Sequence, residues 1–480
     1  MFSKFKTKDT FLKLDLFFYS CIAISFIILL FFIYKIINLI LFNEPNDSLL
    51  IYYSFSSIFC FFSLIFFLYI LNNQQSRRKK FFFLILSSLL TIYGFEIFFN
   101  FPNYSSSFFF NLPNYYSSDE IQSLRIKKAH EQGLEYDERD ILQVIKDYEG
   151  TLLPNFNPGL LVQENFYKEG INTSEGVKIF PISSMSDSKT IFTNDNGYYP
   201  IIQTDSYGFS NEKSLYDNDK VDIVLVGDSY VEGLSVYQKN NIASNLSNSG
   251  FITISLAKAG NGPLIKLASI KEYASSISPD YIIWFFCSND LSNLRYEMNS
   301  NILEKYLINP KFTQNLIMKQ DYVDEAVNIY ISNKIIGENI DNNFQSVNLK
   351  SGIRIEKVVT IIKLTEIRNH IYQFIINIFN NEYEDMEKII LNGNKEISKW
   401  EGKLYVVYLP SFSELENNNT NMRDKIYSIS ENLNIETIDV YNEFQNSGNY
   451  KLFFPFELEG HYNIEGYKLL SDLIIRKISK

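Results

Sequence analysis

A serine at the end of an apolar run is the clearest candidate for chemistry in this sequence. The segment VDIVLVGDSYVEG, residues 221–233, carries a mostly apolar stretch that ends at Gly227-Asp228-Ser229. A serine hydroxyl is a weak nucleophile until a base takes its proton. Of the three histidines, His461 stands just before a predicted helix, in a loop that could reach Ser229, whereas the other two lie on helices predicted elsewhere.

Two further polar blocks follow apolar runs in the same way. Gly260 lies in AKAGNGP, and Asn289 lies in CSND. Acyl transfer requires donors aimed at the oxygen that becomes negative, and a loop amide and an asparagine side chain can supply them. Taken singly, each block is equally consistent with a tight loop or a helix cap, and the Gly-Asp-Ser tripeptide is consistent with an ordinary turn.

The elements that must position these residues are predicted from hydrophobic patterning. Strands are expected at 221–226, 252–256, 281–286, 404–409 and 435–440, separated by helical stretches. Near-continuous apolar strands with crossovers are typical of a parallel sheet covered on both faces. Polar residues that follow such strands gather at the carboxyl edge of the sheet, where ligands bind in open α/β folds.

The order of the blocks, Gly-Asp-Ser, a glycine, Asn-Asp and a late histidine, resembles the SGNH hydrolase superfamily, also called GDSL-type esterases. The resemblance covers roughly residues 200–480. It implies an α/β fold, a flavodoxin-like three-layer domain with a parallel sheet. It also implies Ser229 as nucleophile, His461 as base, an oxyanion hole of Ser229, Gly260 and Asn289, and neither a metal nor another cofactor. The flanks, among them NDNGYYPIIQTDSYGFSNEK at 194–213, resemble a membrane-anchored subgroup associated with surface polysaccharide modification.

The sequence departs from the family pattern at two positions. Cys287 stands where the third block usually has a glycine, and Leu458 stands where the family has its acid, three residues before the histidine. We expect Glu459 to orient His461, with Glu457 as the alternative. A Ser-His pair supported by a backbone carbonyl stays open as a third possibility.

The first hundred residues have a different composition. Apolar runs at 16–42, 50–71 and 81–101 each have about the 20 residues that a membrane-spanning helix requires. The sequence therefore predicts three transmembrane helices ahead of the hydrolase domain. Lysines and arginines cluster before the first run and between the second and third, which predicts a cytoplasmic N-terminus. Later residues would then lie in the periplasm or outside the cell, and the protein would be a multi-pass protein of the inner (cytoplasmic) membrane.

Four regions follow from this reading. They are a cytoplasmic segment (1–15), a transmembrane region (16–101), a juxtamembrane linker with helices (102–160) and the SGNH-like domain (161–480), which has a helical insertion at about 291–400. The formal net charge is −11, because residues 1–80 carry +5 and residues 81–480 carry −16. An acidic domain of this kind argues against nucleic-acid binding.

The expected function is that of an extracytoplasmic serine esterase or O-acyltransferase acting on acetyl esters of a cell-surface glycan. The expected partners are the lipid bilayer, the acylated glycan and a separate membrane acyltransferase. The alternative is a catalytically impaired module that binds glycan or an assembly partner, and the missing acid at position 458 would favour it. The position of His461 relative to Ser229 discriminates between the two.

Overall fold

The computed structural model describes parts of 18–37, residues 47–72, residue 81, and residues 118–148, 151–163, 167–218, 220–348 and 382–479. Two compact units divide the chain. One comprises Met1–Asn114 with Asn348–Asn380, and the other comprises Tyr115–Val347 with Asn381–Lys480. Everything that bears on the candidate site belongs to the second unit.

Helix α2 (Asp47–Leu71) is the longest element among the described residues of the first unit. No helix in the described part of the chain is both long and apolar enough to traverse a membrane. This finding contradicts the expectation of three transmembrane helices. An apolar run predicts a span only where one helix carries about 20 predominantly apolar residues. The predicted run at 16–42 lies partly outside the described residues, and the run at 81–101 lies almost wholly outside them.

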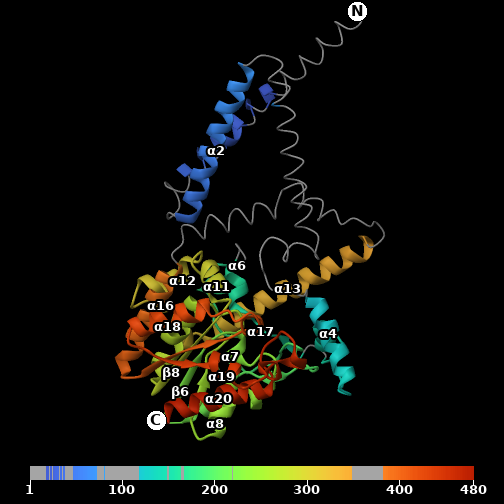
Figure 1. Ribbon diagram of the computed structural model, residues 1–480, viewed down its shortest axis with the longest axis vertical. Coiled ribbons are helices and arrows are strands. Elements are labelled where there is room, and N and C mark those ends of the chain that lie inside the picture. The colour runs from blue at the N-terminus through green and yellow to red at the C-terminus, as the bar shows by residue number, and fades with distance from the viewer. Residues whose placement is uncertain are drawn as a thin grey trace, which may run out of the picture. The chain divides into compact units, whose positions relative to one another are not determined.

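A five-stranded parallel sheet forms the centre of the second unit (Figure 1). Its spatial order is β10-β9-β8-β6-β7. The strands are β6 (Ile223–Val226), β7 (Thr253–Ser255), β8 (Tyr281–Cys287), β9 (Lys403–Leu409) and β10 (Glu436–Asp439). Each lies within or overlaps one of the five predicted runs. Numbered along the chain this is the 2-1-3-4-5 order of flavodoxin-like sheets, so the expected α/β topology is present.

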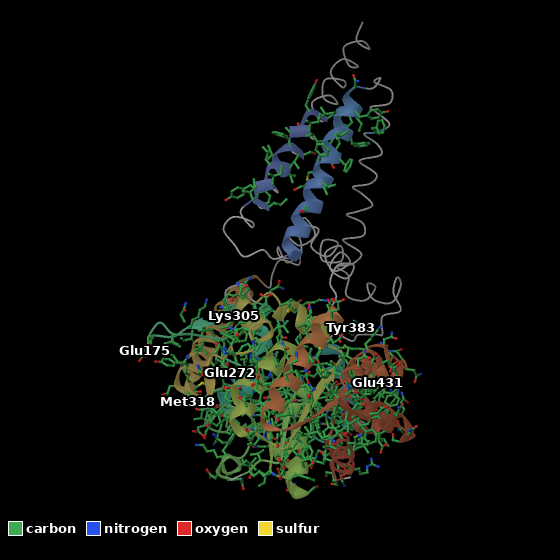
Figure 2. The ribbon with its side chains drawn as sticks, turned by 90° about the vertical axis from the view of Figure 1, so that its left-hand side faces the viewer. Glu175, Glu272, Lys305, Met318, Tyr383 and Glu431 are labelled. Atoms are coloured by element: carbon green, nitrogen blue, oxygen red, sulfur yellow. The ribbon has the colours of Figure 1, made fainter. Side chains whose placement is uncertain are left out.

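Both faces of the sheet are buried because successive strand residues point in opposite directions. Val224, Trp284 and Val406 lie in one apolar cluster, whereas Ile223 and Ile283 belong to the other. Helices α9, α12, α13, α16 and α18 contribute to the first cluster, and α8, α19 and α20 contribute to the second. Figure 1 shows α12, α16 and α18 on one side of the sheet and α8 and α20 on the other. Side chains fill the layers between the sheet and these helices (Figure 2).

The helices of this unit vary from single turns to long rods. They are α4 (Ser118–Glu131), α5 (Ile141–Asp147), α6 (Pro158–Gln163), α7 (Ser229–Glu232), α8 (Ile242–Asn248), α9 (Pro263–Ser269), α10 (Ser275–Ile277), α11 (Asp290–Glu297), α12 (Asn301–Ile308), α13 (Gln320–Asn348), α16 (Glu382–Ile397), α17 (Phe412–Glu416), α18 (Asn421–Asn432), α19 (Val440–Asn446) and α20 (Ile464–Ile478). A π-helical turn, Ile270–Ala274, joins α9 to α10. The predicted helical stretch at 351–379 lies outside the described residues.

Two smaller β structures precede the main sheet. A three-stranded sheet has the order β1-β4-β5 and consists of β1 (Leu153–Pro154), β4 (Lys189–Ile191) and β5 (Ile201–Gln203). A separate pair is formed by β2 (Ile171–Asn172) and β3 (Lys178–Ile179). The β4–β5 loop is held against the segment after α7, because the Thr193 N–H donates to the Leu234 carbonyl over 3.2 Å. This contact brings a loop from outside the main sheet to the edge where Ser229 lies.

Candidate active site

Ser229 begins helix α7, directly after strand β6. The strand-to-helix turn requires glycine at 227, because a Cβ there would collide with Val231. Asp228 caps the helix, with its side chain accepting a 3.1 Å hydrogen bond from the Tyr230 N–H. The turn leaves Ser229 only half-buried, so its hydroxyl lies at the carboxyl edge of the sheet, as the sequence predicts.

His461 lies in the loop before α20. Its Nε2 is 2.9 Å from the Ser229 Oγ. The Tyr230 ring packs against the imidazole, with the ring centroids 4.9 Å apart. The next residue, Tyr462, is fully buried, and its carbonyl accepts a hydrogen bond from Ser235 Oγ. Tyr462 therefore anchors the loop in the protein interior, while His461 faces Ser229.

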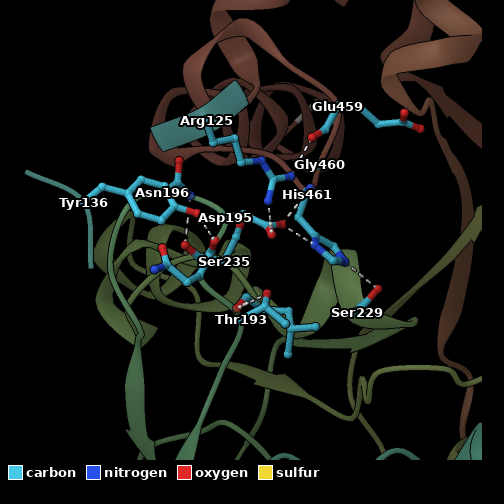
Figure 3. Close-up of polar contacts among 12 residues, drawn as sticks. Arg125, Tyr136, Thr193, Asp195, Asn196, Ser229, Ser235, Glu459, Gly460 and His461 are labelled. Carbon is cyan, nitrogen blue, oxygen red and sulfur yellow. Dashed lines mark hydrogen bonds and ion pairs between the residues drawn. The ribbon is translucent and has the colours of Figure 1, made fainter. Parts of the chain in front are cut away.

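Asp195, on the β4–β5 loop, contacts the other ring nitrogen. Its Oδ2 lies 2.8 Å from His461 Nδ1 and also accepts the His461 backbone N–H at 3.2 Å (Figure 3). Burial alone would raise the pKa of Asp195. The hydrogen bonds and charge of His461, together with the charge of Arg125, outweigh burial and hold that pKa well below its usual range. An ionised carboxylate on Nδ1 keeps the proton there and leaves Nε2 free to accept a proton from Ser229.

The expected acids, Glu459 and Glu457, are not in this position. Figure 3 shows the Glu459 carboxylate directed away from His461, and only its backbone carbonyl is engaged, by Arg125 Nη2 at 2.5 Å. Glu457 is exposed. Phe456 and Glu457 both have left-handed backbone conformations, with φ of 52° and 56°, and the chain turns there. Closeness in sequence therefore does not bring either carboxylate to the imidazole, and Asp195 takes that place.

The two other predicted oxyanion donors lie on neighbouring loops. Asn289 is exposed, and its Nδ2 donates weakly to Asp228 Oδ2 at 3.3 Å, one residue before the serine. An amide has two N–H donors, so a second hydrogen is free to point at a substrate. The Cys287 thiol lies 2.8 Å from Asn289 Oδ1. Burial raises the pKa of Cys287 well above its usual value, and the thiol also lies 3.0 Å from Asp228 Oδ2, so its single S–H can donate to either oxygen.

Gly260 lies in the loop after β7 with φ of 74°, a conformation that favours glycine. A Cβ at this position would also collide with the side chain of Asn157. The loop is tied to α7 by a buried ion pair between Lys258 and Glu232, whose side chains are 1% and 0% exposed. Glu232 also accepts the Ala259 N–H at 2.7 Å. The helix that carries the serine and the loop that carries Gly260 thus form one unit.

Glu297 on α11 is a buried carboxyl next to this loop. It accepts N–H groups at the start of α9, from Leu264 at 2.8 Å and Ile265 at 3.3 Å. Burial raises its pKa to about 8, although these two N–H groups lower it. The folded state therefore holds the proton more tightly than the unfolded chain, in which an ordinary glutamate has a pKa near ~4.3.

This pKa predicts that stability decreases with pH. The stabilising effect of the bound proton is complete below the unfolded pKa and disappears as pH rises through about 8, a loss on the order of 5 kcal/mol. In urea unfolding between pH 4.5 and 8.5, Glu297→Gln should be less pH-dependent than wild type. Glu431→Gln, at an exposed position on α18 (Figure 2), is the matched control. Identical pH slopes for wild type and Glu297→Gln would contradict the prediction.

Reasoning from the sequence missed two residues of this site, Asp195 and Arg125. Asp195 lies in Thr-Asn-Asp-Asn-Gly, a composition typical of a solvated turn. The only signal was its place in one of the flanks that carry the family resemblance. Arg125 carries no motif. In the described part of the chain, no group of three or more His, Cys, Asp or Glu could bind a metal ion.

Comparisons with known proteins found similarity among solved structures alone. No protein-family model and no curated protein match the chain. A lipase/acylhydrolase from Enterococcus faecalis is 13% identical, covers 54% of this chain and 95% of its own, and has a TM-score of 0.29. An esterase from Pseudoalteromonas sp. is 10% identical (54% and 96% covered, TM-score 0.28), and an acetyl xylan esterase is 12% identical (54% and 100% covered, TM-score 0.30). At these identities and TM-scores the similarities carry no weight for the activity, which is inferred below from side-chain geometry.

The fold and the side-chain geometry together show what kind of site this is. A flavodoxin-like parallel sheet places a serine, a histidine and an aspartate in one hydrogen-bonded chain at its carboxyl edge. The glycine and asparagine of the second and third blocks occupy the loops on the same edge. This is the arrangement that the resemblance to SGNH hydrolases implies, with the acid supplied from a different segment.

Proposed function

We propose that this protein is an SGNH-type serine esterase, or a related O-acyltransferase, acting on acyl esters. The observation that carries the proposal is the continuous chain Ser229 Oγ–His461 Nε2 (2.9 Å) and His461 Nδ1–Asp195 Oδ2 (2.8 Å). A serine, a base and an oriented acid at these distances form the arrangement that activates a hydroxyl nucleophile.

In the proposed mechanism, His461 takes the Ser229 proton as Oγ attacks the ester carbonyl. Asp195 stabilises the resulting imidazolium and holds its orientation. The negative oxygen of the tetrahedral intermediate is stabilised by the N–H groups of Ser229 and Gly260 and by Asn289 Nδ2. His461 then gives its proton to the departing alcohol. Water, or the hydroxyl of an acceptor sugar, attacks the acyl-enzyme in the second half and releases Ser229.

Within the class of acyl esters, we propose a more specific substrate. We assign an acetyl ester of a cell-surface glycan, supported by the flanks that resemble polysaccharide-modifying relatives and by the acidic composition, which disfavours nucleic acid. A separate membrane acyltransferase as partner, and a location of the catalytic domain outside the cytoplasm, stay predictions from the sequence.

Labelling and turnover test the proposal directly. The full-length chain should release acetate from p-nitrophenyl acetate and react covalently with a fluorophosphonate probe. Ser229→Ala should abolish labelling and lower kcat by at least ~10³-fold, because no other group replaces the nucleophile. Ser288→Ala, at an exposed position on the same edge of the sheet, is the matched control. Equal labelling of Ser229→Ala and wild type would refute the proposal.

The alternative of a catalytically impaired binding module depended on a missing acid. Asp195 supplies that acid, so the geometry gives no support to the alternative. A protein that failed both assays while folded, yet retained a glycan, would restore it.

A further inference from the structure

Helix α4 precedes the main sheet by about a hundred residues in sequence and contacts the candidate triad. Arg125, in the middle of this helix, is 7% exposed. Its Nη1 donates to Asp195 Oδ1 over 2.8 Å, and its Nη2 donates to the Glu459 carbonyl over 2.5 Å (Figure 3). The Arg125 guanidinium therefore binds both Asp195 and the loop that carries His461, which it contacts two residues before the histidine.

A second contact from the same helix supports this loop. Lys128, one turn after Arg125, donates to the Phe456 carbonyl over 2.9 Å. Gly460 lies so close to Arg125 that a Cβ there would collide with Nη2. The guanidinium is thus packed against the loop backbone as well as bonded to it.

The segment after α4 holds the other side of the Asp195 loop. The Asp137 N–H donates to the Gly197 carbonyl over 2.8 Å, and Tyr136 Oη donates to the Asn194 carbonyl over 3.0 Å. In return, Asn194 Nδ2 donates to the Asp137 carbonyl over 2.6 Å. Residues 125–137 therefore form hydrogen bonds with the loop that carries Asp195, both before and after this aspartate.

Arg125 acts on the triad through its charge as well as through its hydrogen bonds. In the described part of the chain, Asp195 interacts electrostatically with His461, Arg125, Tyr136, Tyr230 and Tyr467, among other groups. Burial raises the pKa of all three tyrosines, so they stay neutral through the range in which a histidine titrates. Arg125 carries a permanent positive charge, and it partly neutralises the carboxylate that would otherwise favour the imidazolium.

We infer that Arg125 is a positioning residue of the active site, and that α4 belongs to the catalytic unit. It acts through Asp195 and the His461 loop, without touching the reacting atoms. This inference rests on the proposed esterase function. It assigns a role in that reaction to a helix that lies before the region covered by the family resemblance.

The test compares Arg125→Lys, Arg125→Ala and Lys127→Ala in the full-length chain. Lys127 is the matched control because it is the neighbouring cation on α4 and its side chain is 72% exposed. We measure kcat and KM for p-nitrophenyl acetate from pH 4.5 to 9, with and without added guanidinium, and record thermal unfolding of each variant.

Arg125→Ala should lower kcat by about 10–100-fold with little change in KM, since displaced catalytic groups lose rate rather than affinity. Its acidic limb in the kcat/KM profile should move to higher pH by about half a unit to one unit, because the unneutralised carboxylate favours the imidazolium. Guanidinium should restore part of the rate. Arg125→Lys keeps the charge but not the two-point contact, so it should lose less rate and keep the wild-type limb. Lys127→Ala should match wild type.

Two results would overturn the inference. One is a folded Arg125→Ala with the rate and pH profile of wild type. The other is a loss of rate in both Arg125 variants that parallels their loss of thermal stability, with no shift of the acidic limb and no rescue by guanidinium. If Arg125→Ala does not fold, Arg125→Lys decides: a fall in kcat with wild-type thermal stability supports the inference, and an unchanged kcat, or a fall that parallels a loss of thermal stability, overturns it. Failure of the esterase proposal itself is separate, because wild type and Ser229→Ala would then be equally inactive or equally active.

Discussion

Asp195→Asn should lower kcat by about 10²–10⁴-fold, whereas Glu459→Gln and Glu457→Gln should stay within about twofold of wild type. The asparagine is nearly the same size as aspartate, but it cannot offer two equivalent acceptor oxygens or a negative charge. The His461 Nδ1 contact of 2.8 Å would then favour the wrong tautomer, and the imidazolium would lose its stabilising carboxylate.

The measurement is steady-state turnover of p-nitrophenyl acetate at the pH optimum, with thermal unfolding of each variant in parallel. Asp195 also accepts a hydrogen bond from Arg125, so some loss of stability is expected in Asp195→Asn. That loss does not explain a fall in the rate measured well below the unfolding temperature. A larger effect at Glu459 than at Asp195 would show that the acid has been assigned to the wrong loop.

The second large effect concerns stability. Lys258→Met should reduce the free energy of unfolding by about 3–5 kcal/mol, because it leaves the Glu232 carboxylate buried without its counter-ion. Both side chains are almost completely inaccessible. Asn155 bonds both partners, at 2.7 Å from Lys258 Nζ and 3.1 Å to Glu232, but an amide cannot balance a charge.

Urea unfolding at pH 7 measures this difference. Lys403→Met is the matched control, since Lys403 pairs with Glu436 on the surface, where the two side chains are 50% and 44% exposed. Exposed pairs contribute about 1 kcal/mol or less. The double variant Lys258→Met/Glu232→Gln should recover part of the loss, because the uncompensated charge is removed. Equal destabilisation by Lys258→Met and Lys403→Met would contradict the account of a buried pair.

The sequence predicted the sheet because its strands are buried on both faces. Each reads as a short, almost uninterrupted apolar run, and the structure places strands β6, β7, β8, β9 and β10 at those runs. Ser229 and His461 were also predictable, since a strand end and a helix start fix their positions locally. Gly260 and Asn289 followed from the same rule, that loops after parallel strands share one edge.

The acid was not predictable because it depends on contacts between distant segments. Asp195 and His461 are 266 residues apart in sequence, and no local pattern links them. Glu459 and Glu457 were expected because the family pattern places the acid just before the histidine. The left-handed residues Phe456 and Glu457 set a different path, which only the folded chain shows.

The position of Asp195 shows that the main sheet and the complete candidate site have different boundaries in the sequence. A fragment beginning at β6 would contain all five strands of the main sheet and both the serine and the histidine. It would lack the β4–β5 loop and α4, and with them the acid and its arginine. The segments that complete the candidate site therefore lie outside the part of the chain that forms the main sheet. Phe156, Phe180 and Phe209, which also precede β6, belong to the apolar cluster on one face of that sheet, so a boundary drawn at β6 would remove core packing together with the proposed acid.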